Sequence, residues 1–295
     1  MARVPFFQGA TPRKQEVRMI QDTKQGVAAP SSPETQPLPS GVQMSDMMPD
    51  PFPKVYLVTG EPTSGKTHFA STFPYPLFID FDGGVVRIKN TGRKFGYRTF
   101  NVLADNGAGL QAELLIREMA SNPNKHPFKT LVLDSCTTWS LAIERQIQSE
   151  DGTLGKGLSL PQYGKVWETF RRMTGPAVMA CQFLVIVCHE TWDRDDQDGR
   201  TFKMPLFIGR KVPDYLPGFA DELYHLWSEV KKDAKTGVET IKFYARVRKD
   251  PPKYEYLRTN IPGLPSVIED PSFEKVAKAG GFYEKAFEPK GGGTK

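Results

Sequence analysis

The sequence predicts an α/β fold with a mostly parallel central sheet, flanked by helices and extended at one edge by antiparallel strands. Two observations support this prediction. Short runs of β-branched and aromatic residues alternate with segments of helical spacing, and such alternation needs the crossover connections of parallel strands. After about residue 200 the alternation gives way to two longer strand-like segments.

The alternating part contains five expected strands and four expected helices. The strands are short apolar runs at 55–59 (VYLVT), 77–81 (LFIDF), 98–102 (RTFNV), 130–135 (TLVLDS) and 183–190 (FLVIVCHE). The helices are a segment that begins near Lys66, then 110–120, 138–148 and 162–181. We expect a break in the last helix at Gly175 and Pro176, because proline lacks the backbone donor that a helix interior needs.

The antiparallel extension is predicted from two strand-like segments that flank a polar stretch. ELYHLWSEV (222–230) and VETIKFYARVR (238–248) lie on either side of KKDAKTG. This arrangement indicates a hairpin with its turn at residues 235–237.

Composition divides the chain into three parts. Residues 1–50 include the Pro/Ser-rich stretch AAPSSPETQPLPSG and lack apolar periodicity, which predicts a disordered N-terminal arm. Residues 51–288 carry the strand and helix signals and are expected to form one folded domain. Residues 289–295 (PKGGGTK) are expected to be a flexible tail.

The bulk composition favours a soluble protein of the cytoplasm. The chain is 39% hydrophobic and 25% charged, and no stretch has the length and apolarity that a bilayer crossing needs. Cys136, Cys181 and Cys188 are odd in number and form no CxxC pair, which favours a reducing compartment. The net charge of +5 permits a polyanionic partner without requiring one.

The segment KVYLVTGEPTSGKTHFA contains a phosphate-binding motif. Gly60, Gly65, Lys66 and Thr67 match G-x-x-x-x-G-K-[ST], with a predicted strand before them and a predicted helix after. In such loops the backbone N–H groups surround the phosphates, the lysine reaches the β- and γ-phosphates, and the hydroxyl coordinates Mg²⁺. The expected nucleotide-binding residues are Gly60, Glu61, Pro62, Thr63, Ser64, Gly65, Lys66, Thr67 and His68.

Asp134 closes the apolar strand TLVLDS and is the candidate for the second Mg²⁺ ligand beside Thr67. An acid at a strand end can instead cap the following helix, and Ser135 could equally do so. The phosphate-binding motif favours the metal role. Lys66 and Asp134 are therefore both candidate catalytic residues.

Asp80 and Asp82, in LFIDFDGG, stand at the end of the predicted strand 77–81, soon after the phosphate-binding motif. On an extended chain both side chains would point to the same side, and Gly83 and Gly84 free the backbone beside the second acid. Nucleotide hydrolysis needs a group that orients or deprotonates the attacking water, and Asp82 is our candidate. The alternative is that the two acids form a turn, as Asp-x-Asp-Gly often does.

Over roughly residues 54–260 the sequence resembles the RecA-like P-loop ATPases. The shared order is the phosphate-binding motif, a strand that closes in acid-x-acid, then TLVLDS, then FLVIVCHE. The chain looks most like the phage branch of these proteins, which acts in recombination and single-strand annealing. The resemblance implies an ATPase that uses ATP and Mg²⁺, is stimulated by single-stranded DNA, and works in the host cytoplasm if it is phage-encoded.

The resemblance also implies roles for individual residues. The catalytic acid of the family is usually glutamate, so Asp82 is a departure, and its shorter side chain is expected to slow hydrolysis. The family's γ-phosphate sensor ends the strand after the second acid, where His189 stands, with Glu190 beside it as the alternative. A lone histidine at this place can equally be structural.

RecA-like proteins bind single-stranded DNA through two mobile loops, which correspond here to residues 149–165 and 191–205. The first is Gly-rich and basic. The second begins with aspartates that would repel DNA, and only its later part is basic with aromatic residues, so it can also be read as a solvated hairpin. The DNA-contact candidates are Lys156, Tyr163, Lys165, Arg200, Lys203, Arg210 and Lys211.

Filament-forming relatives use basic residues of late strands to reach the nucleotide of the neighbouring subunit. Arg246, Arg248 and Lys249 occupy that place here, although an exposed basic edge strand that discourages aggregation would look the same. The resemblance implies a homo-oligomeric ring or filament, with single-stranded DNA and a single-stranded DNA-binding protein as partners and no membrane.

Two other functions are compatible with the motif. A small-molecule kinase or a GTPase would share the loop, but the guanine-reading Asn-Lys-x-Asp motif is absent because NPNKHPF lacks the aspartate. A nucleotide-dependent interaction protein, with the proline-rich arm recruiting a partner, would also share it. Intact Lys66, Thr67, Asp82 and Asp134 argue against an inactive site, but fold alone does not decide among these functions.

Overall fold

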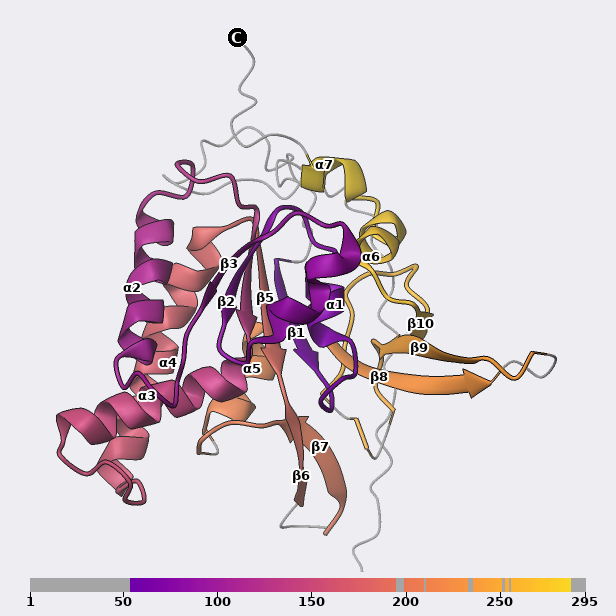
Figure 1. Ribbon diagram of the computed structural model, residues 1–295. Coiled ribbons are helices and arrows are strands. Elements are labelled where there is room, and N and C mark those ends of the chain that lie inside the picture. Colours follow the sequence, from indigo (N-terminus) through magenta and orange to yellow (C-terminus); the bar gives the residue numbers. More distant parts are fainter. Residues whose placement is uncertain are drawn as a thin grey trace, which may run out of the picture. The chain divides into compact units, whose positions relative to one another are not determined.

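The computed structural model describes residues 54–194, 199–209, 211–232, 236–250, 253–254 and 256–287, apart from the side chains of residues 211, 213 and 214. The predicted arm at 1–50 and the tail at 289–295 lie outside the described residues. The described part contains one large sheet with helices on both faces and a separate two-stranded ribbon (Figure 1). Among its helices, none has the length and hydropathy needed to cross a membrane.

The large sheet has eight strands. Their bounds are β1 (Val55–Thr59), β2 (Pro76–Asp80), β3 (Gly96–Thr99), β4 (Thr130–Asp134), β5 (Phe183–Cys188), β8 (Glu222–Lys232), β9 (Glu239–Arg246) and β10 (Val267–Glu269). The ribbon consists of β6 (Glu190–Arg194) and β7 (Thr201–Pro205). The helices are α1 (Lys66–Ala70), the 3₁₀ helix η3 (Gly84–Thr91), α2 (Ala108–Ser121), α3 (Cys136–Glu150), α4 (Leu160–Ala180), α5 (Lys211–Phe219), α6 (Phe273–Ala279) and α7 (Tyr283–Phe287).

The strand order of the sheet is β10-β9-β8-β1-β5-β4-β2-β3. All neighbours from β8 to β3 run parallel, while β9 and β10 add antiparallel pairs at one edge. The predicted fold class is therefore confirmed: this is the α/β arrangement of a P-loop NTPase, with a mostly parallel sheet extended by antiparallel strands. The β8–β9 hairpin is also the one that the sequence predicts.

Strand register brings distant residues to one edge of the sheet. Thr59, at the end of β1, lies opposite Cys188 of β5 on one side and His225 of β8 on the other. Asp134 of β4 lies opposite Asp80 of β2. The carboxyl ends of the parallel strands are where α/β sheets bind ligands, so the candidate site residues meet there.

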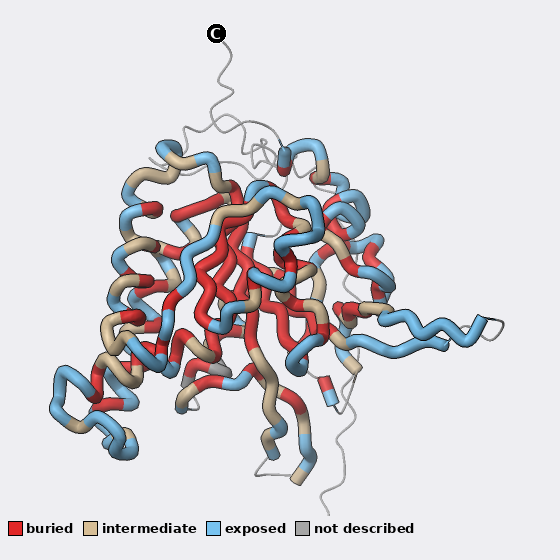
Figure 2. Tube along the Cα trace, in the orientation of Figure 1, coloured by how far each residue is buried: buried red, intermediate tan, exposed pale blue. Residues whose placement is uncertain are grey.

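Alternation along the buried strands divides the core into two layers. In β1, Leu57 packs with the layer under α2, α3, α4 and α5, and Tyr56 and Val58 pack with the layer under α1, α6 and α7. Both layers are closed to solvent along the centre of the sheet, whereas the β8–β9 hairpin projects from it with its outer part exposed (Figure 2).

The expected break in the fourth helix is wrong. α4 runs from Leu160 to Ala180 with Pro176 inside it. Met173 and Ala177, on either side of the proline, are both buried in the core layer that α4 covers. Packing of this apolar face outweighs the local cost of the proline.

Several strand ends also differ from the expectation. β2 stops at Asp80, and β3 begins two residues before the expected segment, in register with β2. β5 stops at Cys188, and Glu190 belongs to β6, which leaves the large sheet to pair with β7. The apolar runs show where the strands lie, but the polar residues after them belong to the loops that form the site.

Candidate active site

The phosphate-binding motif forms the loop between β1 and α1. Lys66 is buried, and its Nζ donates hydrogen bonds to the carbonyl oxygens of Gly60 at 2.8 Å and Glu61 at 2.7 Å. Burial lowers the pKa of the Lys66 ammonium group, and the nearby Asp134 carboxylate opposes that shift. The loop thus holds a desolvated cation against oxygens that phosphate oxygens could replace.

Gly65 shows why the motif requires glycine at this place. Its φ of +90° lies in the left-handed region, and a Cβ there would lie 2.6 Å from Cδ1 of Phe243. Phe243 comes from β9, so the antiparallel extension of the sheet packs directly against the loop. Any side chain at position 65 would push the loop and Phe243 apart.

Thr67 and Asp134 form a pair suited to a divalent cation. The Thr67 hydroxyl donates to Oδ2 of Asp134 at 2.7 Å. Burial, together with the nearby carboxylates of Asp82 and Asp80, raises the pKa of the Asp134 carboxyl to about 6, although the hydrogen bond from Thr67 opposes the shift. A Cβ on Gly84 would lie 3.2 Å from the Thr67 hydroxyl and 3.3 Å from Oδ2 of Asp134, so glycine leaves room beside the pair.

These two oxygens fit Mg²⁺ bound in the manner of nucleotide enzymes. The described residues include no group of three or more His, Cys, Asp or Glu side chains that could form an all-protein metal site. Mg²⁺ is commonly held by one or two protein oxygens together with substrate phosphates and water. A cation beside Asp134 would also favour the ionised form that burial disfavours.

Of the two acids Asp80 and Asp82, Asp80 has a structural role. It is fully buried, and its carboxylate accepts hydrogen bonds from the N–H of Gly84 at 3.0 Å and from the hydroxyl of Thr99 at 3.1 Å. The turn that the sequence offered as the alternative is therefore present for this residue. Because β2 ends at Asp80, the expectation that Asp80 and Asp82 share one side of an extended strand is wrong.

Asp82 lies in the bend after β2 and lines the same cavity as Lys66 and Asp134. Its Oδ2 is 3.3 Å from Nε2 of His189, and its side chain is 27% exposed. Burial alone would raise the pKa of Asp82, but hydrogen bonds, above all from His189, outweigh it and leave the pKa below the usual value. The carboxylate is ionised at neutral pH, as a proton acceptor must be.

The two sensor candidates, His189 and Glu190, point in different directions. His189 lines the cavity with Asp82, and its Nδ1 is buried without a hydrogen-bond partner among the described residues. Glu190 faces the other way, with a side chain only 2% exposed and paired with Lys203 and His225. Of the two, only His189 is placed toward the phosphate-binding loop.

The cavity between these groups has a volume of about 460 Å³. It brings together the loop, Asp82, Asp134 and His189, which the sequence predicts as site residues. It also includes residues that sequence reasoning missed: Arg87, Ile88, Ile241 and Phe243. Arg87 could have been noticed as a cation five residues after Asp82, but the β9 residues become visible only through the sheet topology.

A family model described as an AAA domain matches residues 53–250, more than half of the chain. The chain belongs to this family of AAA domains. The family and the fold together make it a P-loop ATPase.

One solved structure similar to this AAA domain is an ATPase from the type III secretion system of pathogenic bacteria. The two chains are 12% identical with a TM-score of 0.37, and the match covers 58% of this chain and 51% of that chain. This chain therefore spans about half the length of that ATPase. No curated protein matches the sequence.

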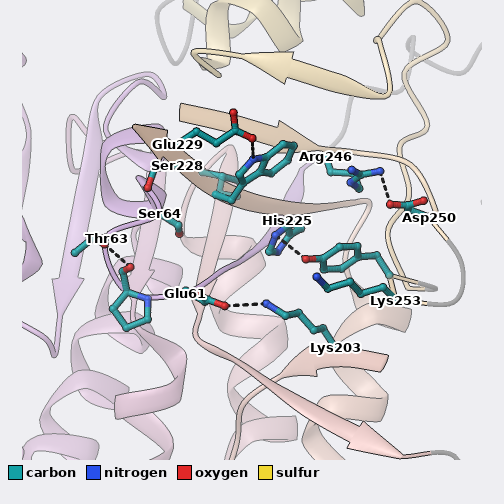
Figure 3. A pocket seen from close by; sticks show the side chains of 14 residues that line it. Glu61, Thr63, Ser64, Lys203, His225, Ser228, Glu229, Arg246, Asp250 and Lys253 are labelled. Carbon is teal, nitrogen blue, oxygen red and sulfur yellow. Dashed lines mark hydrogen bonds and ion pairs between the residues drawn. The ribbon is translucent and has the colours of Figure 1, made fainter. Parts of the chain in front are cut away.

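A second cavity, of about 490 Å³, lies on the other side of the phosphate-binding loop of the AAA domain (Figure 3). Its floor is a chain of buried polar groups. Lys203 pairs with Glu190, and its Nζ also lies 3.1 Å from Oε1 of Glu61. Nδ1 of His225 is 2.9 Å from Oε2 of Glu190, and its Nε2 is 3.0 Å from the hydroxyl of Tyr254.

The DNA-contact candidates of the AAA domain do not share one environment. Lys156 and Arg200 are exposed, and Tyr163 and Lys165 lie in the first turns of α4 rather than in a loop. Lys165 is engaged by Asp151, with Nζ 2.6 Å from Oδ1. Arg210 and the side chain of Lys211 lie outside the described residues.

The prediction that Lys203 contacts DNA is wrong. Its side chain is only 7% exposed and points inward from β7 to two carboxylates, so it cannot also lie along a DNA backbone on the surface. The sequence reading of 191–205, as a DNA-binding loop or a solvated hairpin, does not say which of its side chains face inward. Here the face that carries Lys203 is the buried one.

The three residues predicted to contact a neighbouring subunit also have different surroundings. Arg246 lines the second cavity, with Nη1 2.5 Å from Oδ2 of Asp250 and its guanidinium 5.6 Å from the ring of Trp227. Arg248 donates to the carbonyl oxygen of Leu264 at 3.2 Å, and Lys249 is exposed. A role for them between subunits stays a prediction.

Proposed function

We propose that this AAA domain binds ATP with Mg²⁺ through the loop Gly60–His68 and hydrolyses ATP to ADP and phosphate. The observation that carries the proposal is the meeting of Lys66, Thr67, Asp134 and Asp82 around one cavity at the carboxyl ends of parallel strands. Each group has the chemistry that one part of phosphoryl transfer needs.

The proposed roles follow from the contacts of each side chain. Lys66 binds the β- and γ-phosphate oxygens in place of the loop carbonyls. Thr67 and Asp134 would hold Mg²⁺, which offsets the phosphate charge when bound. Asp82 orients a water and accepts its proton as the oxygen attacks the γ-phosphorus and the bond to the bridging oxygen of ADP breaks. His189 positions the Asp82 carboxylate and faces the γ-phosphate.

We further propose that the ATPase acts with single-stranded DNA in phage-type recombination or annealing, as a RecA-like ring or filament that works with a single-stranded DNA-binding protein. The order of motifs supports this function. So do the exposed side chains of Lys156, Tyr163 and Arg200, since cations and aromatic rings contact the backbone and bases of single strands.

A second candidate is a nucleotide-dependent interaction protein whose turnover does not respond to DNA. Two contacts favour it. Lys203 is buried in ion pairs and Lys165 is engaged by Asp151, so two of the cations proposed for DNA are already occupied within the chain.

Steady-state ATP hydrolysis with and without single-stranded DNA, for the wild-type chain and Lys66→Ala, separates the two. A Lys66-dependent rate that DNA increases supports the recombination ATPase. A Lys66-dependent rate indifferent to DNA supports the interaction protein. A rate that survives Lys66→Ala contradicts the site itself.

A further inference from the structure

The 3₁₀ helix η3 follows Asp82 directly and forms one side of the nucleotide cavity. Val85 and Ile88 are three residues apart, which places them on one side of such a helix, and both are buried. At its start, the N–H of Gly84 is held by the Asp80 carboxylate. The helix is therefore fixed at its beginning and along one side, and its polar side chains have defined positions.

Arg87 extends from this helix into the cavity that Lys66 also lines. Its side chain is exposed and makes no hydrogen bond or ion pair with any described residue. The next arginine along the chain is different, because Arg93 lies 3.1 Å from Nε2 of His68 and donates to the Ser71 hydroxyl at 3.0 Å. Arg87 thus offers an unused guanidinium to whatever occupies the cavity.

The charge of the cavity favours a cation beyond Lys66. Apart from its two histidines, the lining holds two cations, Lys66 and Arg87, and two carboxylates, Asp82 and Asp134, whose charges cancel. A magnesium-bound triphosphate keeps a net negative charge, and charge remains on the γ-phosphate oxygens as the bond breaks. Without Arg87 the described lining would be net negative beside an anion.

We infer that Arg87 is a catalytic residue that contacts the γ-phosphate oxygens of the nucleotide bound to its own chain, an inference that rests on the proposed function. A guanidinium suits this task because its planar fork of donors can bind two phosphate oxygens at once. The resemblance assigned such a contact to a neighbouring subunit through Arg246, Arg248 or Lys249. Arg87 completes the site within one chain.

The test compares Arg87→Ala and Arg87→Lys with Lys89→Ala. Lys89 is a matched control, because it is an exposed cation of the same 3₁₀ helix that does not line the cavity. For each protein we would measure kcat and KM for ATP with Mg²⁺. We would also measure, by calorimetry, the affinity for ADP alone and for ADP with aluminium fluoride, which mimics the phosphoryl group in transfer.

We expect Arg87→Ala to lower kcat by about 10³-fold, the lower end of the effect of a transition-state arginine, with KM little changed. Affinity for ADP should stay at the wild-type value, and affinity for ADP with aluminium fluoride should fall. Arg87→Lys should recover part of the loss in kcat and part of the loss in affinity for ADP with aluminium fluoride. Lysine keeps the positive charge but lacks the planar donors of the guanidinium. Lys89→Ala should match the wild type throughout.

Three results would overturn the inference. If Arg87→Ala behaves like Lys89→Ala, or weakens ADP and the mimic equally, Arg87 does not act on the transferring group. If a mixture of Arg87→Ala and Lys66→Ala chains regains activity, one chain supplies Arg87 to another and the assignment within one chain is wrong. Failure of the proposed function looks different, because the wild type would then show no Lys66-dependent turnover of ATP.

Discussion

The two cavities on either side of the phosphate-binding loop differ in how their polar groups are satisfied. The side chains of Glu190, Lys203 and His225 form a continuous chain of contacts at the second cavity and are closed to solvent, whereas Nε of Arg246 there is buried without a partner among the described residues. In the nucleotide cavity, the Arg87 side chain and Nδ1 of His189 have no hydrogen-bond partner among the described residues.

This difference distinguishes polar groups that hold the fold from polar groups that await a ligand. A buried network that is fully connected fixes the packing of the elements it joins. Groups without partners in a cavity keep their hydrogen-bonding capacity for something that enters. Substitutions in the two cavities should therefore have separate effects, on stability in one and on turnover in the other.

The largest expected effect is that of Lys66→Ala, which should lower ATP turnover by more than about 10³-fold. The variant removes the ammonium group that would bind the β- and γ-phosphates, and no other described cation occupies the loop interior. Steady-state phosphate release measures the loss, with Lys89→Ala as the control. Unchanged turnover would show that this cavity is not the site of hydrolysis.

Asp82→Asn should lower turnover by about 10²–10⁴-fold while nucleotide affinity stays close to that of the wild type. The amide keeps the size of the side chain but cannot accept the proton of the water. Fluorescent-nucleotide titration and turnover on the same preparation separate the two quantities. Loss of binding would assign Asp82 to the structure of the cavity instead.

Lys203→Met tests the second cavity, where the comparison predicts an effect on stability. It leaves the buried Glu190 carboxylate without its ammonium partner, and breaking a buried pair in this way costs about 3–5 kcal/mol of unfolding free energy. Lys165→Met, which removes an exposed pair with Asp151, should change stability little. Urea unfolding of both variants measures the difference, and equal stabilities would mean that the second cavity has no structural network.

The smallest expected effect is a pH dependence of stability that originates at Glu190. Burial alone would raise the pKa of Glu190, but contacts with His225 and Lys203 outweigh it and hold the pKa below the usual 4.5. The folded state therefore keeps this carboxylate ionised at pH values where the unfolded chain protonates it. The stabilisation is present above about pH 4.5 and is lost as the pH falls through the lowered pKa.

The variant Glu190→Gln, which cannot titrate, checks this dependence. The difference in unfolding free energy between the wild type and Glu190→Gln should stay constant from about pH 7 down to about 4.5 and shrink as the pH falls below that value. A difference that stays constant below about pH 4.5 as well would show that Glu190 does not contribute through its charge.

The strands and the phosphate-binding loop could be predicted because their signals are local. Apolar runs such as 55–59 and 130–135 identify buried strands, and the motif glycines reflect a backbone that only glycine can adopt at Gly65. The break expected at Pro176 failed because the packing of α4 against the core is a property of the whole fold.

The rest of the site depends on contacts between residues far apart in sequence. Lys203 looks like a surface cation until the fold brings it to Glu61, 142 residues earlier in the chain. Arg87 lies on a 3₁₀ helix and Phe243 on an antiparallel strand, and both side chains line the nucleotide cavity. No local sequence pattern predicts where these two elements lie. Sequence reasoning therefore found the acids and the loop, but not the side chains around them.

Pro62, Thr63 and Ser64 line both cavities, so one turn of chain is the partition between two compartments. A side chain enlarged on this turn takes volume from one compartment or the other, according to the direction in which it points. Saturation mutagenesis of these three positions, scored once for stability and once for turnover, would therefore sort substitutions by the compartment they enter. The phosphate-binding motif, usually regarded as one functional unit, would then have two faces that differ in which substitutions they tolerate.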